Sequence, residues 1–365
     1  GPSLTAGRPV PQLRMQRLLA LVGTLLPLPL LGHWLGNHWL TPLLVLVALP
    51  LIDLLVGRDE SNPTPEQIAA SQYDRWLYLP LRAWLPVQCA LIAWGAWEFA
   101  QPRTSAWQGL GLLLSVGLVS GGQGITIAHE LGHRRSRLDR WLAQALLITV
   151  GYGHFHIEHN RGHHARVATQ DDPATARRGE GFYRFWWRAL PGGWRSAWAL
   201  ELARLERQDL PCWRAHNMML WYAAVPLALL LAFGLVLGPL GAAFFAGQAL
   251  VAVSLLEAVN YIEHYGLQRQ RGSDGRLEPV THHHSWNAAE RVSNAWLFNL
   301  QRHADHHANP GLPYVALRHH ADSPQLPTGY TGMLWLALLP PLWLRLMDRR
   351  IDALAANALR SRSAA

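Results

Sequence analysis

The hydrophobic positions of this chain gather into six long runs separated by polar stretches. Each run is close to the ~20 residues that an α-helix needs to cross the hydrocarbon layer of a bilayer. The runs cover residues 18–36, 39–57, 84–100, 106–128, 217–237 and 240–261. The pattern predicts an all-α, polytopic membrane protein with about six transmembrane helices.

The polar links between the runs predict the orientation. The chain has 32 arginines and no lysine, and the short links after the first, third and fifth runs contain only Arg103. Because cytoplasmic loops carry the excess of basic residues, we expect both termini and the large polar segments to be cytoplasmic. This topology is typical of a multi-pass protein of the bacterial inner (cytoplasmic) membrane.

The same boundaries divide the chain into five segments. We expect an N-terminal segment, four transmembrane helices, a cytoplasmic histidine-rich cap, two further transmembrane helices and a second part of the cap: residues 1–17, 18–128, 129–216, 217–261 and 262–365. The opening Gly-Pro-Ser is typical of the remnant of a cleaved expression tag. The apolar stretch 333–347 contains two adjacent prolines, so we expect a broken helix at the membrane interface rather than a seventh span.

Three clusters of histidine lie in the expected cap. Residues three or four positions apart share one face of an α-helix, so each cluster can direct two or three imidazoles at one point. The clusters are His129 and His133; His159, His163 and His164; and His303, His306 and His307. Eight imidazoles packed together without a cation would leave many ring nitrogens without partners. The clusters therefore predict a metal centre.

The number of histidines favours two metal ions. Structural zinc closes at four ligands and catalytic zinc usually takes three, so eight histidines exceed one site. His264 is a candidate ninth ligand, because it shares a helical stripe with Glu257 and Asn260 at the end of the sixth run. Imidazole binds zinc, copper, iron and nickel alike, so the ligand set leaves the ion open.

Carboxylates beside the clusters are candidates for a supporting layer. Ligating histidines commonly donate their second ring N–H to a carboxylate, which fixes the tautomer. The candidates are Glu130, Glu158, Glu263 and Asp305, with Asn260 on the His264 stripe. We expect a structural or supporting role for four other histidines: His154, His156, His319 and His320.

Two other functions fit parts of this pattern. The string from His129 to His133 matches H-E-x-x-H, the signature of zinc metalloproteases in which Glu130 would be the general base. An intramembrane protease, however, leaves the other six clustered histidines without a role. A metal transporter needs ionisable groups in the middle of the membrane, whereas the six runs keep their charges near their ends.

The clusters, of the form HxxxH, HxxxHH and HxxHH, resemble those of the membrane-bound, histidine-rich non-haem diiron family. This family includes fatty-acid desaturases, sterol oxidases, and xylene and alkane monooxygenases. Longer strings are similar to bacterial alkane 1-monooxygenases and extend over nearly all of the chain after about residue 40. They are EHNRGHH (158–164), NYIEHYGL (260–267), HSWN (284–287), LQRHADHHA (300–308), LPTGY (326–330) and PPLW (340–343).

The resemblance implies a monooxygenase with two non-haem iron ions as cofactors and His264 among their ligands. Such an enzyme uses O2 to hydroxylate the terminal methyl of a medium-chain n-alkane to a 1-alkanol, with electrons from rubredoxin and rubredoxin reductase. Ala304 stands where the family commonly has serine, and the run 282–284 is richer in histidine than expected, which leaves its contact with the metals open. A related membrane diiron desaturase or hydroxylase of fatty acyl chains shares the clusters and is the alternative.

Cysteine usage and charge bear on the partners. Cys89 and Cys212 form no CxxC pair, so the chain carries no rubredoxin or iron–sulfur module and its electrons must come from another protein. The net charge of +8 follows the topology rule and favours contact with anionic membrane lipid. It would also attract an acidic soluble donor. Nucleic acid is not an expected partner.

Asp53, near the cytoplasmic end of the second run, indicates which face of that helix points inward, because a carboxylate at membrane depth faces the bundle. Leu49 and Leu46, four and seven residues earlier, share that face in an α-helix. An alkane whose methyl group points at cytoplasmic metals must extend up the bundle. We therefore expect both leucines to line a substrate tunnel.

Overall fold

The computed structural model describes residues 11–72 and 74–363, and these residues form helices and loops without a β-strand. The predicted all-α class is confirmed. The first ten residues of the expected N-terminal segment lie outside the described residues. In chain order the α-helices, 3-10 helix and π-helices are α1 (Pro11–Leu25), α2 (Leu28–Trp34), α3 (Leu40–Leu43), η1 (Leu44–Ala48), α4 (Leu49–Val56), α5 (Pro65–Gln72), α6 (Arg75–Phe99), α7 (Ala106–Val119), η2 (Ser120–Ile125), α8 (Thr126–Gly132), α9 (Arg137–Thr149), α10 (Phe155–Ile157), η3 (Glu158–His163), α11 (His164–Arg166), α12 (Phe182–Arg207), α13 (Met218–His264), α14 (Arg291–Trp296), α15 (His303–Ala308), η4 (Tyr314–Ala316), α16 (Tyr330–Ala337) and α17 (Pro340–Ser363).

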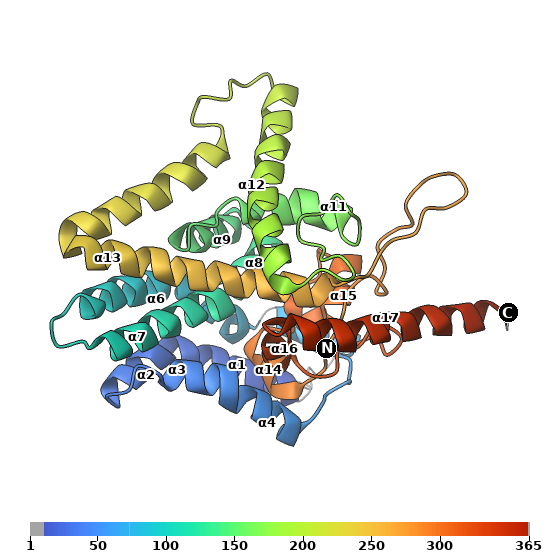
Figure 1. The fold of residues 1–365 in the computed structure, drawn as a ribbon, viewed down its shortest axis with the longest axis horizontal. Helices are drawn as coiled ribbons and strands as arrows, with labels where there is room; N and C mark the ends of the chain where they lie inside the picture. The colour runs from blue at the N-terminus through green and yellow to red at the C-terminus, as the bar shows by residue number, and fades with distance from the viewer. Residues whose placement is uncertain (1–10, 73, 364–365) are drawn as a thin grey trace, which may run out of the picture.

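Long apolar helices lie side by side in the bundle, with α13 packed against α6 and α7 (Figure 1). The fifth and sixth apolar runs form the two arms of α13, which meet at Gly238; its φ of 72° lies in the left-handed region that glycine adopts without strain. By length and composition, two helices can cross a membrane, Ala106–Gly132 and Met218–His264, and Leu13–Leu25 with Leu28–Trp34 gives a third if this bent pair is one span. The count of about six spans, the domain boundaries and the cytoplasmic cap therefore remain predictions.

The helix that leads to the first histidine cluster is interrupted by η2, whose sequence is Ser-Gly-Gly-Gln-Gly-Ile. A Cβ atom on Gly121 would lie 2.8 Å from the backbone of Ala252, and one on Gly124 would lie 2.0 Å from the Gln88 amide. Only glycine at position 121 permits α13 to approach this closely, and Gly124 leaves room for the buried Gln88 amide. The close contact fixes the start of α8 against α13, so that His129 and His264 reach the same region.

The expected broken helix over residues 333–347 is confirmed. α16 ends at Ala337 and α17 begins at Pro340. Trp343 is fully buried, with its ring 4.8 Å from that of Tyr261 and 5.5 Å from that of Tyr265. These contacts attach the start of α17 to the end of α13, while the rest of α17 extends away from the bundle (Figure 1). The position of this segment at a membrane interface stays a prediction.

Asp53 points into the protein, as expected. Its side chain is 1 % exposed, and its Oδ1 accepts the backbone N–H of Ser293 at 3.0 Å. This bond ties the end of α4 to the segment that precedes the third histidine cluster. The inward face of the second apolar run is thereby identified.

Candidate metal centre

The three histidine clusters and His264 come together from four segments of the chain: α8, η3 with α11, α13 and α15. His129 lies in α8 and His133 directly follows it, His303 begins α15, and His264 is the last residue of α13. The middle cluster differs from its expected geometry, because residues 158–163 form the π-helix η3 rather than an α-helix. A π-turn contains about one residue more than an α-turn and is frequent at functional sites. It leaves His159 and His164 directed at one group of rings and His163 at another.

Five of the imidazoles form one group, which we call the five-histidine group: His129, His133, His159, His164 and His306. Their Nε2 atoms make a continuous series of short approaches. Nε2 of His306 lies 3.0 Å from that of His129 and 3.2 Å from that of His164, and Nε2 of His159 lies 3.1 Å from those of His133 and His164. The five Nε2 atoms thus converge on one point.

The remaining four imidazoles form the four-histidine group: His163, His264, His303 and His307. Nε2 of His307 lies 3.1 Å from that of His163 and 2.9 Å from that of His303, which is 3.2 Å from Nε2 of His264. All four side chains are buried. The sequence-based inference that His264 joins the three clusters agrees with this arrangement.

Within each group, the distances between Nε2 atoms fit ligands of one shared ion. Imidazole nitrogens ~2.0–2.1 Å from a metal, at angles between octahedral and tetrahedral values, lie about 2.9–3.4 Å from one another. The observed Nε2 separations of 2.9–3.2 Å fall in this range. In four of these histidines the other ring nitrogen, Nδ1, is buried without a hydrogen-bond partner: His159, His164, His303 and His307. Two groups of four and five nitrogens suit two ions.

Burial favours the neutral form of five of these rings, which is the state that binds a metal: His133, His164, His303, His306 and His307. Burial, followed by the neighbouring imidazoles, lowers the pKa of His133 to about 3, and burial with the charge of His163 and other rings lowers that of His164 to about 2. The pKa values of His303, His306 and His307 are lowered for the same two reasons. Protons therefore do not compete with a cation for these nitrogens near neutral pH.

Asp172 is the carboxylate that supports a candidate ligand, and the sequence analysis missed it. Nδ1 of His163 donates to Oδ2 of Asp172 at 2.8 Å, and the same oxygen accepts from the Thr175 hydroxyl at 2.6 Å. Asp172 is fully buried. The only signal in the sequence is an Asp-Asp pair eight and nine residues after His163, which has no fixed helical relation to it.

The expected supporting carboxylates have other partners, so this part of the expectation is corrected. Glu130 accepts the backbone N–H of Tyr314 at 3.2 Å, Glu158 accepts from Arg166 at 2.9 Å, and Asp305 accepts from His320 at 3.0 Å. A residue adjacent to a ligand on a helix points about 100° away from it, so these side chains face away from the ligands' second nitrogens. Asn260 lies 3.4 Å from Glu257 and lines the cavity described below.

Glu263 reaches the metal-facing side of a candidate ligand rather than its second nitrogen. Its Oε2 lies 3.1 Å from Nε2 of His303, while its Oε1 is buried without a hydrogen-bond partner. Ser285, in the HSWN string, lies 3.4 Å from Nδ1 of His264. The neighbouring His284 instead contacts Glu278 at 3.1 Å, and the run 282–284 joins neither histidine group.

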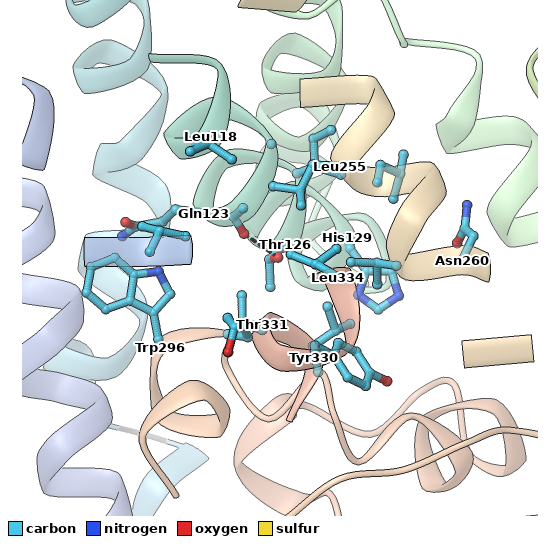
Figure 2. A pocket seen from close by; sticks show the side chains of 18 of the residues that line it. Leu118, Gln123, Thr126, His129, Leu255, Asn260, Trp296, Tyr330, Thr331 and Leu334 are labelled. Atoms are coloured by element: carbon cyan, nitrogen blue, oxygen red, sulfur yellow. Dashed lines mark hydrogen bonds between the residues drawn. The ribbon is translucent and has the colours of Figure 1, made fainter. Parts of the chain in front are cut away.

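An apolar cavity reaches both histidine groups. His129 and His159 of the five-histidine group and His303 of the four-histidine group line it, together with Glu263. Most of the other lining side chains are aliphatic and come from α4, α7, α13 and α16. In Figure 2 the Trp296 ring lies at the left and the His129 ring to the right of it, with Thr126 and Thr331 between them.

Leu49 lines this cavity, but Leu46 does not, against the sequence-based expectation. Val45 takes the place expected for Leu46. The reason is the π-helix η1 over residues 44–48, which inserts one residue into the turn before Leu49. Asp53 and Leu49 keep their α-helical relation. One turn before Leu49, however, the residue that faces the cavity is Val45 instead of Leu46.

Comparisons with known proteins agree with this architecture. Residues 105–337 match the family model described as fatty acid desaturase. The chain is 45 % identical to alkane 1-monooxygenase 1 of Pseudomonas aeruginosa over 83 % of this chain and 80 % of that protein. It is 40 % identical to alkane 1-monooxygenase of Acinetobacter baylyi over 85 % and 76 %, and 28 % identical to the xylene/toluene monooxygenase hydroxylase component of Pseudomonas putida over 88 % and 84 %.

The family model spans all nine converging histidines, and the matches to the two alkane 1-monooxygenases cover more than four-fifths of the chain. Both histidine groups lie within the region shared with the desaturase model, whereas Val45 and Leu49 of the cavity precede it. The H-E-x-x-H string is thus one element of a larger histidine site, and the protein is an oxidoreductase that belongs to the alkane 1-monooxygenase family of membrane diiron enzymes.

Proposed function

We propose that this protein hydroxylates the terminal methyl of medium-chain n-alkanes to 1-alkanols, with O2 as co-substrate and two non-haem irons bound by the nine histidines. The balanced reaction takes RH, O2, two electrons and two protons to ROH and water. The observation that carries the proposal is the apolar cavity that ends on both histidine groups. A pocket of this kind is the form of site that an uncharged hydrocarbon requires.

The residues of the chain have three tasks in this reaction: they hold the alkane, they direct its terminal carbon at the metal side of the rings, and they exclude water. Iron, unlike zinc, has redox chemistry and can supply the activation of O2. The aliphatic side chains of the cavity hold the alkane by shape, because a saturated chain offers no charge or hydrogen bond. The end of the cavity at His129, His159 and His303 directs the terminal carbon at the metal side of the rings. Closed packing around the rings excludes water from the reacting carbon.

The experiment that tests this function is product analysis. Purified, iron-loaded protein with a reductase, rubredoxin and O2 should convert octane to 1-octanol. A fatty acyl substrate is the matched comparison, because the family model that matches is named for fatty acid desaturases. Turnover of the acyl substrate to an alkene, with no alcohol formed from octane, would instead establish the desaturase function.

Chain-length preference should depend on Leu49, which is 7 % exposed and lines the cavity. Each methylene transferred from water into an apolar site contributes ~0.8 kcal/mol. Leu49→Ala extends the space and should move the preferred alkane to a greater length by one or more carbons, whereas Leu49→Trp should shorten it. The measurement is the relative kcat/KM over a series of alkanes.

Leu46 provides the matched control for this experiment. It has the same side chain, lies three residues away and does not line the cavity. Leu46→Trp should leave the chain-length profile unchanged. If the Leu46 variant shifts the profile and the Leu49 variants do not, the cavity is not the alkane tunnel.

A basic hollow near His133 is the candidate docking site for an acidic rubredoxin. Arg134, Arg135, Arg140 and Arg161 line the hollow together with His133, which belongs to the five-histidine group. An electron arriving here would enter the site through His133, a candidate ligand. The hollow supports the expectation that the histidine-rich end of the bundle faces the cytoplasm, where the basic loops are expected.

Salt should slow the rubredoxin-coupled reaction. Raising the ionic strength to 1 M shortens the Debye screening length to ~3 Å. The attraction between the basic hollow and an acidic donor then becomes weaker. The rate should therefore fall under donor-limited conditions, and Arg135→Glu should lower it several-fold at low salt. Single turnover of enzyme reduced chemically beforehand should not change. A coupled rate independent of salt would contradict electrostatic docking.

A further inference from the structure

A third set of metal-binding side chains lies at the other end of the bundle from the nine histidines. His33 comes from α2, His38 from the turn that follows it, and Glu98 from the last turn of α6. The loop after Glu98 leads into α7, and the helical stretch Ala106–Gly132, made of α7, η2 and α8, separates this loop from His129. At ~1.5 Å per residue, the two ends of that helix are more than about 30 Å apart. The three residues are therefore independent of the site described above.

The turn that carries His38 is held in place by buried bonds. Its backbone N–H donates to the Gln108 side chain at 2.8 Å, and its carbonyl accepts the Ser115 hydroxyl at 2.6 Å. The imidazole is 8 % exposed, and its Nδ1 is buried without a hydrogen-bond partner. A buried, unpartnered ring nitrogen on a fixed backbone is costly unless a ligand occupies it.

Glu98 and His33 complete the arrangement. The Glu98 carboxylate is buried, and its two oxygens accept from Arg103 and from the Thr104 hydroxyl, which orient it. His33 is exposed and stacks on His38 with ring centroids 5.4 Å apart. One ligand atom from each of the three residues lies within 4.8 Å of the others. Within the described part of the chain, neither imidazole makes an ion pair with Glu98.

We propose that His33, His38 and Glu98 bind one divalent transition-metal ion of the zinc or copper type, with water in the remaining position. Two imidazoles and one carboxylate are a ligand set that these ions accept. Ligating carboxylates normally keep further hydrogen bonds, so the contacts of Glu98 with Arg103 and Thr104 are compatible with metal binding. The ion attaches α2 and the following turn to the end of α6.

The test uses iron-loaded enzyme in detergent, with His282 and His320 both replaced by alanine. These two residues and Asp322 form another group that can bind a metal at the surface. Their removal leaves one candidate site beyond the nine histidines in the part of the chain that the structure describes. The protein is incubated with Zn²⁺, desalted and analysed for iron and zinc. We expect one zinc per chain above an unchanged iron content, and a rise in Tm on adding Zn²⁺.

His33→Ala should remove the bound zinc and the rise in Tm while octane hydroxylation is retained. Because His33 is exposed, this variant should fold normally. His216→Ala, which removes an exposed histidine outside all these groups, should keep both effects. Glu98→Gln should weaken zinc binding by tenfold or more.

Cu²⁺ gives a spectroscopic readout that does not depend on turnover. Its electron paramagnetic resonance spectrum should show coupling to two imidazole nitrogens, and this signal should be lost in His33→Ala. Zinc that remains bound in both His33→Ala and His38→Gln would overturn the proposal. Zinc that binds only as iron is lost would also overturn it, since the ion would then occupy the nine-histidine site.

Discussion

Replacing any one of His133, His163 and His306 with alanine should abolish alkane hydroxylation and lower the iron content of the purified protein. His133 and His306 belong to the five-histidine group, and His163 belongs to the four-histidine group. Each substitution removes one of the converging Nε2 atoms and leaves a space that water can enter. The four-histidine group has no spare histidine, so His163→Ala should lose about one of two irons, given that three protein ligands bind a metal less tightly than four.

Metal analysis and activity are measured on the same samples, with His216→Ala as the control. His216 is exposed and belongs to neither group, so its loss should change neither quantity. Reconstitution with added Fe²⁺ separates weaker binding from misfolding, because a folded variant should regain part of its iron at high concentration. Full activity in any of the three variants would contradict the assignment of two irons to these groups.

Asp172→Asn should reduce iron affinity by about 10- to 100-fold, the usual effect of removing a carboxylate that supports a ligating histidine. The carboxylate accepts the Nδ1–H of His163 at 2.8 Å and so directs Nε2 at the metal side of the ring. Asparagine has nearly the same shape, but its amide can present a donor to that N–H. The His163 ring then loses its fixed orientation, although the fold is preserved.

The matched control is Asp171→Asn, which makes the same chemical change one position earlier at an exposed residue. It should leave iron affinity and activity unchanged. Iron titration of the apoprotein measures the affinity, and activity at saturating iron separates metal loss from a direct effect on turnover. Equal iron affinity in the two variants would mean that Asp172 does not support a ligand.

Local spacing allowed the sequence to predict much of this protein. The six apolar runs, the all-α class, the broken helix near residue 340 and the inward direction of Asp53 all follow from patterns shorter than about 25 residues. The three histidine clusters also follow from helical spacing, since residues three or four apart share a face. Such patterns act within one element, where sequence distance determines spatial distance.

Only the tertiary structure decided how the elements combine. His163 and His164 are adjacent in sequence, yet they belong to different groups, because neighbouring residues on a helix point about 80–100° apart and meet rings from different segments. Asp172 reaches His163 because the chain turns back after α11, whereas the carboxylates beside the ligands face elsewhere. The π-helix η1 replaced Leu46 with Val45 in the cavity.

The proposed site of His33, His38 and Glu98 likewise depends on tertiary structure. About sixty residues separate its carboxylate from its imidazoles, and the packing of α2 against the end of the bundle brings them together. The sequence by itself therefore determined which residues form helices and which imidazoles share a helical face. The fold decided which faces meet, because a contact between distant segments depends on packing, close glycine approaches and local π-turns, none of which has a fixed spacing in the sequence.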